Sequence, residues 1–228
     1  MKTDLVLPSH IGIIMDGNRR WAKKHGRDAD YGHTIGYETV LKVAKKCRDL
    51  GIKNLTVYAL STENKKRKTT ELKGIFRLLL RGIEENTDQF LKEGFRLKII
   101  GNKESLPSII RKAIDRAEQK TDECEQGSIN VAFNYGGREE IINSIKKLFA
   151  KGVAVDEQSV SDNLYTAGLP DPDLIIRSGG QYRLSNFLIW QSAYSELYFT
   201  DCLWPEFGEE ELAKALEFYS KTQRNFGK

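Results

Sequence analysis

The sequence predicts an α/β fold, a single domain with a mainly parallel central sheet flanked by helices, and three observations favour it. Short apolar runs alternate along the 228 residues with longer segments of helical periodicity, as in successive βαβ units. The runs are continuously apolar, which is typical of parallel strands buried on both faces. No linker, repeat or low-complexity segment interrupts the pattern, so we expect one domain over residues 1–228.

The predicted elements follow in chain order. Runs rich in Ile, Leu and Val predict strands over 11–15, 55–60, 97–100, 129–133 and 174–176, with a sixth candidate at 197–199. Apolar residues at helical spacing predict helices over 35–50, 70–93, 105–124, 138–151 and 209–221.

The composition argues against several classes of protein. Hydrophobic residues make up 39% and charged residues 30%, which is typical of a folded globular chain. The net charge of +4 is too small to predict nucleic-acid binding, but it leaves room for a local basic pocket that holds an anion. No apolar run approaches the roughly 20 residues of a membrane span, and the N-terminus has no signal-peptide core, so we expect a cytoplasmic protein.

Cysteines and histidines give little support for a zinc site. Cys47, Cys124 and Cys202 are odd in number and far apart, which argues against a disulfide framework, and we expect them to pack as small hydrophobic residues. The spacing of the three histidines matches no zinc pattern. His33 could donate to a phosphate or transfer a proton, or it could simply start the helix that follows.

Polar segments that contain Gly or Asn follow four of the expected strands. Turns favour such residues for conformational reasons alone. In an open parallel sheet, however, ligands bind beyond the carboxyl ends of the strands. The candidate site therefore combines 16–21 (DGNRRW), 61–64 (STEN), 134–138 (NYGGR) and 177–183 (RSGGQYR).

Asp16 ends the first strand and precedes an expected helix, so its simplest role is that of a helix N-cap. Its neighbours favour another role. Gly17 lets a ligand approach the backbone, the amides that follow lie at a helix N-terminus, and Arg19 and Arg20 can hold phosphate oxygens. Because a carboxylate and a phosphate repel each other unless a cation bridges them, the pattern indicates Mg²⁺ beside Asp16.

A second anion site is expected after the fifth strand, where Arg177, Arg183 and Ser185 surround two consecutive glycines. The chain has no GxxxxGK[ST] loop and no GxGxxG fingerprint, so ATP and NAD lose support. Glu196 stands between apolar residues. Taken alone it is a solvated or paired carboxylate, but it would be a second metal ligand if the fold brought it to Asp16.

The expected helix 70–93 carries an apolar stripe. Leu72, Phe76, Leu79 and Ile83 fall at helical spacing, and neighbouring leucines widen the stripe. Periodicity alone favours a packed core. With two phosphate sites nearby, the same stripe could instead line a cavity for an apolar substrate tail.

At these positions the sequence resembles the cis-prenyltransferase (isoprenyl transferase) family, whose best-known member is undecaprenyl diphosphate synthase. The resemblance covers nearly the whole chain, in long motifs that occur in order. The motifs are 10–22 (HIGIIMDGNRRWA), 31–33 (YGH), 61–64 (STEN), 134–138 (NYGGR), 173–177 (DLIIR), 183–191 (RLSNFLIWQ), 193–199 (AYSELYF) and 224–227 (RNFG).

The resemblance implies a homodimeric enzyme that needs Mg²⁺ and holds the growing prenyl chain in a hydrophobic tunnel. Such an enzyme condenses an allylic diphosphate, commonly farnesyl diphosphate, with successive isopentenyl diphosphates and forms cis double bonds. Asp16 is the implied essential carboxylate and metal ligand, and Glu196 completes the metal site. Asn64 is the implied proton acceptor, although an amide is a poor base and a diphosphate oxygen or a water accepts a proton more easily.

The resemblance also implies three groups of substrate-binding residues. They are Gly17, Asn18, Arg19, Arg20, Trp21 and His33 at the allylic diphosphate, Arg177, Arg183, Leu184 and Ser185 at the isopentenyl diphosphate, and Ser61, Thr62, Glu63 and Arg67 around the reacting centre.

Four positions depart from the family pattern. Lys65 stands where Trp is usual, Lys68 where Pro is usual, Ala29 where Arg is usual and Gln181 where Glu is usual. Arg27 is near enough to substitute for the arginine missing at Ala29. None of the four removes an implied metal carboxylate or anion-site arginine, so we expect them to affect the affinity for the allylic substrate more than catalysis.

The length of the product depends in this interpretation on Ala59. Long-chain bacterial members tend to have a small residue there, although packing of a strand against a helix explains Ala59 equally well. We expect the product to be a long-chain cis-polyprenyl diphosphate, namely undecaprenyl diphosphate, the precursor of the glycan carrier lipid for cell wall biogenesis. We also expect this protein to lie at the membrane surface and to deliver the product to the membrane.

Two alternatives to a long-chain synthase remain. One is a short- or medium-chain cis-prenyl diphosphate synthase, and the other is a non-catalytic subunit of a heteromeric enzyme. The retained Asp16 and arginines argue against the non-catalytic subunit.

Overall fold

A computed structural model describes residues 5–66 and 69–223 of the chain. Arg67, Lys68 and the motif at 224–227 lie outside the described residues, as does the side chain of Lys65. Six strands form one parallel sheet in the order β3-β4-β2-β1-β5-β6, which confirms the predicted α/β class. The strands are β1 His10–Ile14, β2 Asn54–Ser61, β3 Phe95–Ile100, β4 Gly127–Tyr135, β5 Leu174–Arg177 and β6 Glu196–Phe199.

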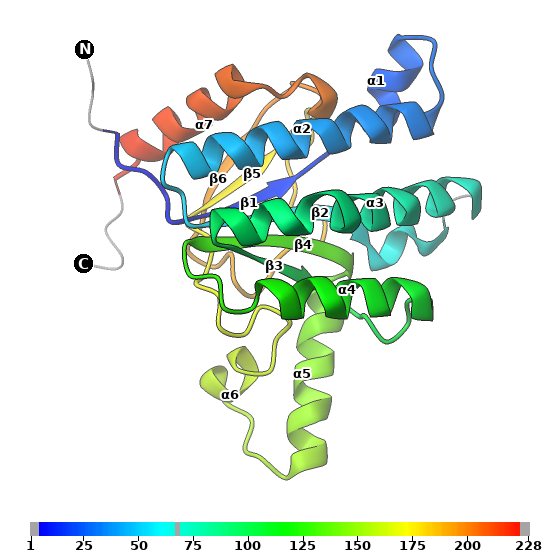
Figure 1. Ribbon diagram of the computed structural model, residues 1–228. Helices are drawn as coiled ribbons and strands as arrows, with labels where there is room; N and C mark the ends of the chain where they lie inside the picture. The colour runs from blue at the N-terminus through cyan, green and yellow to red at the C-terminus, as the bar shows by residue number, and fades with distance from the viewer. Residues whose placement is uncertain (1–4, 67–68, 224–228) are drawn as a thin grey trace.

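The helices cover mainly one face of this sheet (Figure 1). Apolar side chains of the sheet pack there against α2, α3, α4 and α7 in the main core. The other face is covered in part by an irregular segment that buries Phe187 and Leu188 against β1, β2 and β5. The helices are α1 Asn18–Lys24, α2 Ala29–Asp49, α3 Thr69–Glu93, α4 Ser108–Thr121, α5 Gly137–Lys151, α6 Glu157–Ser161 and α7 Glu209–Lys221.

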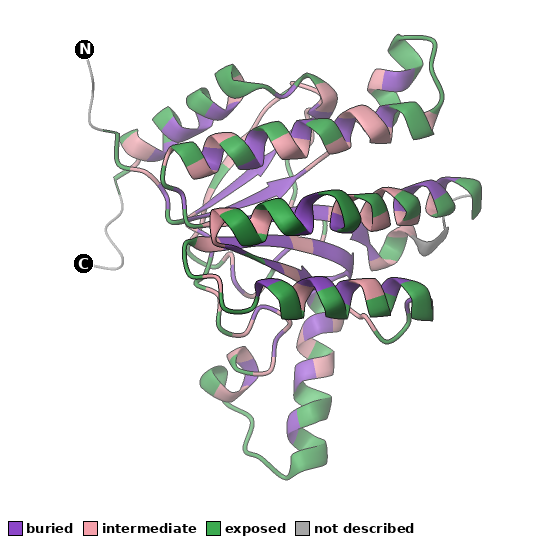
Figure 2. Cartoon of the chain, viewed as in Figure 1, coloured by how far each residue is buried: buried purple, intermediate pink, exposed green. Residues whose placement is uncertain are grey.

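Burial follows the layers of the fold. The strands β1, β2, β4 and β5 are mostly buried and the edge strand β6 is only partly buried, whereas the helices bury one side and expose the other (Figure 2). No helix in the described part of the chain is long and apolar enough to cross a membrane. The cysteines are free, and only Cys47 is fully buried.

Two helix boundaries differ from the prediction for local reasons. The helix expected over 35–50 begins at Ala29, because the Asp28 side chain accepts a hydrogen bond from the Tyr31 backbone N–H and caps it there. The helix expected over 105–124 begins only at Ser108, after Pro107. A proline disfavours helical backbone in the residue before it, so the helix cannot extend further back.

A buried carboxylate holds α5 against the irregular segment. Glu140 Oε2 accepts hydrogen bonds from the Tyr135 hydroxyl and from Gln191, and Oε1 accepts one from the Tyr165 backbone N–H at 2.8 Å. Burial raises the pKa of Glu140 in spite of these donors. The carboxyl group therefore links four parts of the chain behind the sheet.

Replacing Glu140 with glutamine is expected to lower the free energy of unfolding by about 1–3 kcal/mol, because an amide NH₂ would face groups that are themselves donors. Chemical denaturation measures the effect. Glu139→Gln is the matched control on a less buried neighbour and should change stability by less than about 0.5 kcal/mol. Equal effects of the two variants would contradict the role given to Glu140.

Candidate active site

The backbone of Asp16 is fixed from two sides at the carboxyl end of β1. Its N–H donates to Ser178 Oγ at 3.0 Å, and its carbonyl accepts from Ser178 Oγ at 2.8 Å and from the Trp204 N–H at 3.0 Å. Ser178 and Trp204 are both fully buried. The position of the Asp16 carboxylate is therefore set by buried neighbours that follow β5 and β6.

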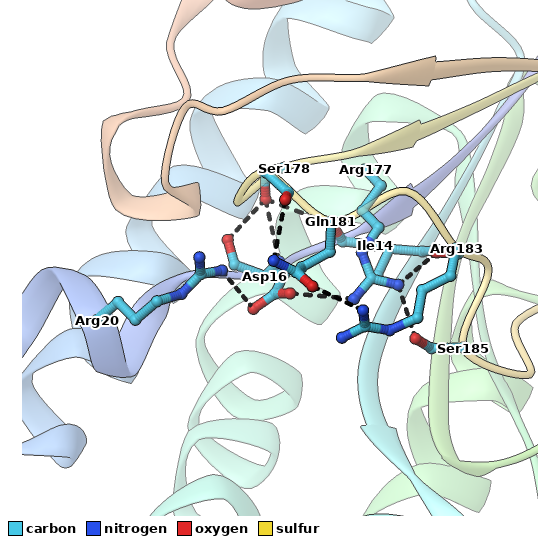
Figure 3. Close-up of polar contacts among 9 residues, drawn as sticks. Ile14, Asp16, Arg20, Arg177, Ser178, Gln181, Arg183 and Ser185 are labelled. Atoms are coloured by element: carbon cyan, nitrogen blue, oxygen red, sulfur yellow. Dashed lines mark hydrogen bonds and ion pairs between the residues drawn. The ribbon is translucent and has the colours of Figure 1, made fainter.

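The Asp16 side chain lies between two guanidinium groups (Figure 3). Oδ1 accepts from Arg20 Nη2 at 3.1 Å, and Oδ2 accepts from Arg177 Nη2 at 3.0 Å. Asp16 does not cap α1, because Gly17 occupies the N-cap position without a side-chain hydrogen bond. The N-cap interpretation of Asp16 is therefore wrong, and the carboxylate is available for another role.

Arg177 is the buried centre of the second predicted anion site, the one that follows the fifth strand. Its side chain is 5% exposed, and Nη1 donates to Ser185 Oγ at 2.7 Å and to the carbonyl of Arg183. The Arg183 side chain is exposed and donates to Gln181 Oε1 at 2.6 Å. The two predicted anion sites thus meet at Asp16, whose carboxylate is held by two guanidinium groups.

Glycines allow the segments to approach closely. Gly17 has a φ of 114°, a value that favours glycine, at the turn between β1 and α1. A Cβ on Gly179 would lie 2.5 Å from Arg20 Nη2, and a Cβ on Gly32 would lie 2.4 Å from the carbonyl oxygen of Asn18. Side chains at Gly179 and Gly32 would therefore displace Arg20 and the whole of α1.

The segment after β2 presents Ser61, Glu63 and Asn64. The Asn64 N–H donates to Ser61 Oγ at 3.2 Å, and Asn186 Nδ2 donates to Glu63 Oε1 at 2.7 Å. Burial alone would raise the pKa of Glu63, but hydrogen bonds from its own N–H and from Asn186, Ser61 and Thr62 outweigh burial and hold that pKa below its usual value. Glu63 is therefore a carboxylate at neutral pH.

His33 lies inside α2 and contacts α3. Its Nε2 is 3.2 Å from Glu71 Oε1, and the same oxygen lies 3.9 Å from Arg19 Nε. His33 does not start its helix, which begins four residues earlier. The contact connects α1, α2 and α3 at the edge of the sheet that holds Asp16.

A cavity of about 690 Å³ opens beside these groups and extends between α2, α3 and the sheet. Its inner wall is apolar, and Leu79 and Ile83 of the predicted α3 stripe line it together with Ile75 and Ala59. Leu72 and Phe76, the other members of the stripe, pack against the core instead. Nine predicted site residues line the cavity: Asp16, Asn18, His33, Ser61, Glu63, Asn64, Arg177, Arg183 and Ser185.

Other predicted site residues lie outside the lining. Trp21 stacks on Tyr31, with ring centroids 6.2 Å apart, and Leu184 packs into the smaller core behind the sheet. Thr62 lies against Gly136. Gly17, Arg19 and Arg20 lie beside the cavity on α1 or at its start, and Arg67 lies outside the described residues.

Glu196 requires a correction within one chain. It begins β6 and pairs with Leu174, which pairs with Ile11, so it lies level with the start of β1. Asp16 follows the other end of β1, about 16 Å further along the strand direction at about 3.3 Å per residue. The expectation that Glu196 completes a metal site with Asp16 of the same chain is therefore wrong. The strands β1 and β6 run in the same direction, and Glu196 begins β6 whereas Asp16 follows the end of β1.

The donor set at Asp16 fits a divalent cation only together with an anion. The described residues hold no cluster of three or more metal-ligating side chains. Mg²⁺ accepts one or two carboxylates when phosphate oxygens and waters supply the remaining ligands. Arg20 and Arg177 would repel a bare cation but would attract a diphosphate that carries one, so Asp16 fits a Mg²⁺–diphosphate pair.

Sequence reasoning missed two positioning residues. Ser178 binds both polar groups of the Asp16 backbone, and Asn186 holds Glu63 and also accepts from the Arg138 N–H at 2.9 Å. Asn186 has a φ of 65°, and asparagine tolerates this region better than most residues. Both residues lie in segments that the sequence already marks, Ser178 in the polar segment 177–183 and Asn186 in the motif 183–191, but no feature of the sequence gives either residue its partner.

Comparisons with known proteins agree with one another. A family model described as "Putative undecaprenyl diphosphate synthase" matches residues 14–227. An isoprenyl transferase of Fusobacterium nucleatum is 43% identical over 97% of this chain and 96% of its own length. A protein of Pyrococcus horikoshii named tritrans,polycis-undecaprenyl-diphosphate synthase (geranylgeranyl-diphosphate specific) is 41% identical over 98% of this chain and 88% of its own length.

Solved structures show the same fold at 35% identity. A crystal structure of lavandulyl diphosphate synthase from Lavandula x intermedia in complex with dimethylallyl diphosphate has a TM-score of 0.93 and covers 97% of this chain and 99% of its own. A crystal structure of "a probable undecaprenyl diphosphate synthase" from Campylobacter jejuni has a TM-score of 0.81 and covers 99% of this chain and all of its own.

Proposed function

Since the chain belongs to the cis-prenyltransferase family, we propose that it condenses an allylic diphosphate with successive isopentenyl diphosphates to give a cis-polyprenyl diphosphate. One observation carries the proposal: the Asp16–Arg20–Arg177 cluster lies at the entrance of an apolar cavity of about 690 Å³. This arrangement fits a substrate with a strongly anionic head and a long hydrocarbon tail. Farnesyl diphosphate is the proposed starter and undecaprenyl diphosphate the proposed product.

The chemistry follows from the charges around the cluster. The bond between the allylic carbon and its diphosphate breaks, the electron pair leaves with the diphosphate, and the alkene of isopentenyl diphosphate attacks the cationic carbon. Arg19 and Arg20 would stabilise the leaving diphosphate, and Arg177, Arg183 and Ser185 would hold the isopentenyl diphosphate. Mg²⁺ held by Asp16 would neutralise charge on the leaving group.

The last step releases a proton. Loss of the proton from the isopentenyl unit forms the new double bond and leaves an allylic diphosphate five carbons longer, together with inorganic diphosphate. Asn64 lines the cavity and can position the acceptor, but its amide is a poor base. An oxygen of the departing diphosphate is the proposed acceptor.

The product assay tests this proposal directly. The protein is incubated with Mg²⁺, labelled isopentenyl diphosphate and, separately, dimethylallyl, geranyl, farnesyl and geranylgeranyl diphosphates, and the dephosphorylated products are separated by length. A ladder reaching about eleven isoprene units supports a long-chain synthase, and shorter ladders support the short- or medium-chain alternative. No incorporation with any starter would reject the enzyme and favour a non-catalytic subunit.

We also propose that two copies of the chain associate through the exposed side of α5. Ile142, Ile145 and Phe149 lie there, and Phe149 is 86% exposed. Exposed apolar side chains on one helix face are typical of an interaction surface. Sedimentation equilibrium measures the state of the chain: a dimer supports the homodimer, and a monomer at micromolar concentration rejects it.

A further inference from the structure

Asn186 joins three of the segments that follow strands at the edge of the sheet that holds Asp16. Its backbone carbonyl accepts from the Gly137 N–H at 2.8 Å, and its side-chain Oδ1 accepts from the Arg138 N–H at 2.9 Å. Gly137 and Arg138 are the first residues of α5, whose N-cap, Gly136, has no side chain that could bind them. Asn186 therefore caps α5 from another part of the chain, and this attachment to a helix of 15 residues fixes its position.

The other end of the Asn186 side chain reaches the segment after β2. Its Nδ2 donates to Glu63 Oε1 at 2.7 Å, so both polar atoms of the side chain have partners. Gly136 makes room for this contact, because a Cβ there would lie 2.5 Å from Thr62 Oγ1 and 2.9 Å from Asn186 Nδ2. A side chain at Gly136 would therefore push apart the segments that follow β2 and β5.

The residue before Asn186 belongs to the proposed isopentenyl diphosphate site. Ser185 Oγ accepts from Arg177 Nη1 at 2.7 Å (Figure 3), whereas the next side chain along the chain contacts Glu63. Ser185 and Asn186 have φ values of 50° and 65°, in a region that few residues other than glycine adopt. The contact with Glu63 is therefore one peptide unit away from a hydroxyl that would hold the diphosphate.

Glu63 belongs to a turn that presents Ser61 and Asn64 to the cavity of the candidate active site. The Asn64 N–H donates to Ser61 Oγ at 3.2 Å, and hydrogen bonds from Ser61, from Thr62 and from its own N–H reach the Glu63 carboxylate. Asn186 is the partner of Glu63 from outside this turn. Fixing the carboxylate therefore fixes the turn that carries Ser61 and Asn64.

We propose that Asn186 is the positioning residue that couples the isopentenyl diphosphate site to the segment 61–64. A diphosphate held at Ser185 then also sets the placement of Asn64 beside the reacting carbons. The inference rests on the proposed function, which supplies the diphosphate and the condensation that follows its binding. The coupling acts in both directions, because a change at Glu63 that shifts Asn186 also shifts Ser185.

Exchanging the donor and the acceptor tests the coupling. Asn186→Asp keeps an acceptor for the Arg138 N–H but turns a carboxylate toward Glu63, so kcat/KM for isopentenyl diphosphate should fall by about ten- to a hundredfold. Adding Glu63→Gln supplies an amide NH₂ that donates to the new carboxylate, while the amide oxygen still accepts from donors within the segment 61–64. The double variant is therefore expected to recover to within about fivefold of the parent.

The double variant also distinguishes coupling from two independent roles. Groups that act independently give a double variant worse than either single one, so a double variant no more active than Asn186→Asp would overturn the coupling. The affinity for farnesyl diphosphate, measured by titration, should change by less than about twofold in Asn186→Asp, because the allylic diphosphate is assigned to α1. Equal losses for the two substrates would indicate a general disturbance of the structure and would also overturn the inference.

The matched control is a second asparagine–glutamate pair, outside the cavity lining. Asn102 Nδ2 donates to Glu139 Oε1 at 3.2 Å, and Asn102 Oδ1 accepts from the Ser105 N–H at 3.3 Å, which repeats the pattern at Asn186. Asn102→Asp, alone or with Glu139→Gln, should leave kcat/KM for isopentenyl diphosphate within about twofold of the parent. A loss in Asn102→Asp as large as that in Asn186→Asp would contradict the special position of Asn186.

Asn186→Gly keeps the inference testable if Asn186→Asp does not fold. Glycine adopts a φ of 65° without strain, and it removes both side-chain hydrogen bonds while the backbone carbonyl still caps α5. This variant should lose about tenfold or more in kcat/KM for isopentenyl diphosphate, with thermal unfolding showing that it is folded in the assay. Kinetics like those of the parent would overturn the inference. A parent that forms no product from any starter would instead reject the proposed function.

Discussion

Asp16→Asn is expected to lower kcat by about a thousandfold with farnesyl and isopentenyl diphosphates, because it removes the charge that would hold Mg²⁺ against the leaving diphosphate. The fold should persist. The asparagine amide oxygen can still accept from Arg177 Nη2, and the backbone contacts to Ser178 and Trp204 do not involve the side chain. Thermal unfolding of the variant checks this point.

Binding without turnover separates the metal role of Asp16 from a structural one. Without Mg²⁺, the Asp16 carboxylate repels a diphosphate, so Asp16→Asn should bind farnesyl diphosphate more tightly than the parent. With Mg²⁺, the order should reverse. Titration of both proteins with and without the ion measures the four affinities. Activity near that of the parent, or an order of affinities unchanged by Mg²⁺, would contradict the assignment.

Arg177→Lys is expected to lower kcat/KM for isopentenyl diphosphate by about two to three orders of magnitude, even though the charge is kept. The guanidinium bridges Asp16, Ser185 and the Arg183 carbonyl from a position that is 5% exposed. A lysine ammonium is a single point and cannot reach all three. The Nε of Arg177 is also buried and makes no hydrogen bond to any described residue. Lysine has no donor at this position.

The matched comparison for this prediction is Arg183→Lys. The Arg183 side chain is exposed and makes a hydrogen bond to Gln181, so the same substitution there should reduce kcat/KM by about tenfold or less. Steady-state kinetics with isopentenyl diphosphate varied and the starter saturating gives both values. A greater loss in Arg183→Lys than in Arg177→Lys would reverse the roles given to the two arginines.

The inner strands could be predicted because burial on both faces leaves a continuous apolar run, and every expected strand, the partly exposed edge strand β6 included, is present to within two residues. The short helices were harder. α6 has a local signal, since Asp156 and Ser159 form a capping box, but five residues carry no clear periodicity. α1 was expected only as a helix after Asp16, and its close packing on α2 depends on Gly32, which helical propensity counts as unfavourable.

Only some of the contacts in the site could be predicted from the sequence. Arg177 could be grouped with Asp16 because both lie at the carboxyl ends of strands, and those strands are parallel neighbours. Glu196 could not be placed, because a sequence motif does not say in which direction its strand runs through the sheet. The contact between Asn186 and Glu63 joins residues 123 apart through an irregular segment, for which no periodicity exists.

The pairing of β1 has a consequence for how the protein is made. β1 is complete by residue 14 and finds β2 by residue 58, but its other neighbour, β5, is not synthesised until residues 174–177. During translation, one edge of β1 therefore stays unpaired while more than a hundred residues are added, and an unpaired edge is prone to association with other chains. The Asp16–Arg177 contact, 161 residues apart, forms only when the chain is nearly finished. A diphosphate can stabilise the completed protein by binding, but it cannot assist the earlier stages of its folding on the ribosome.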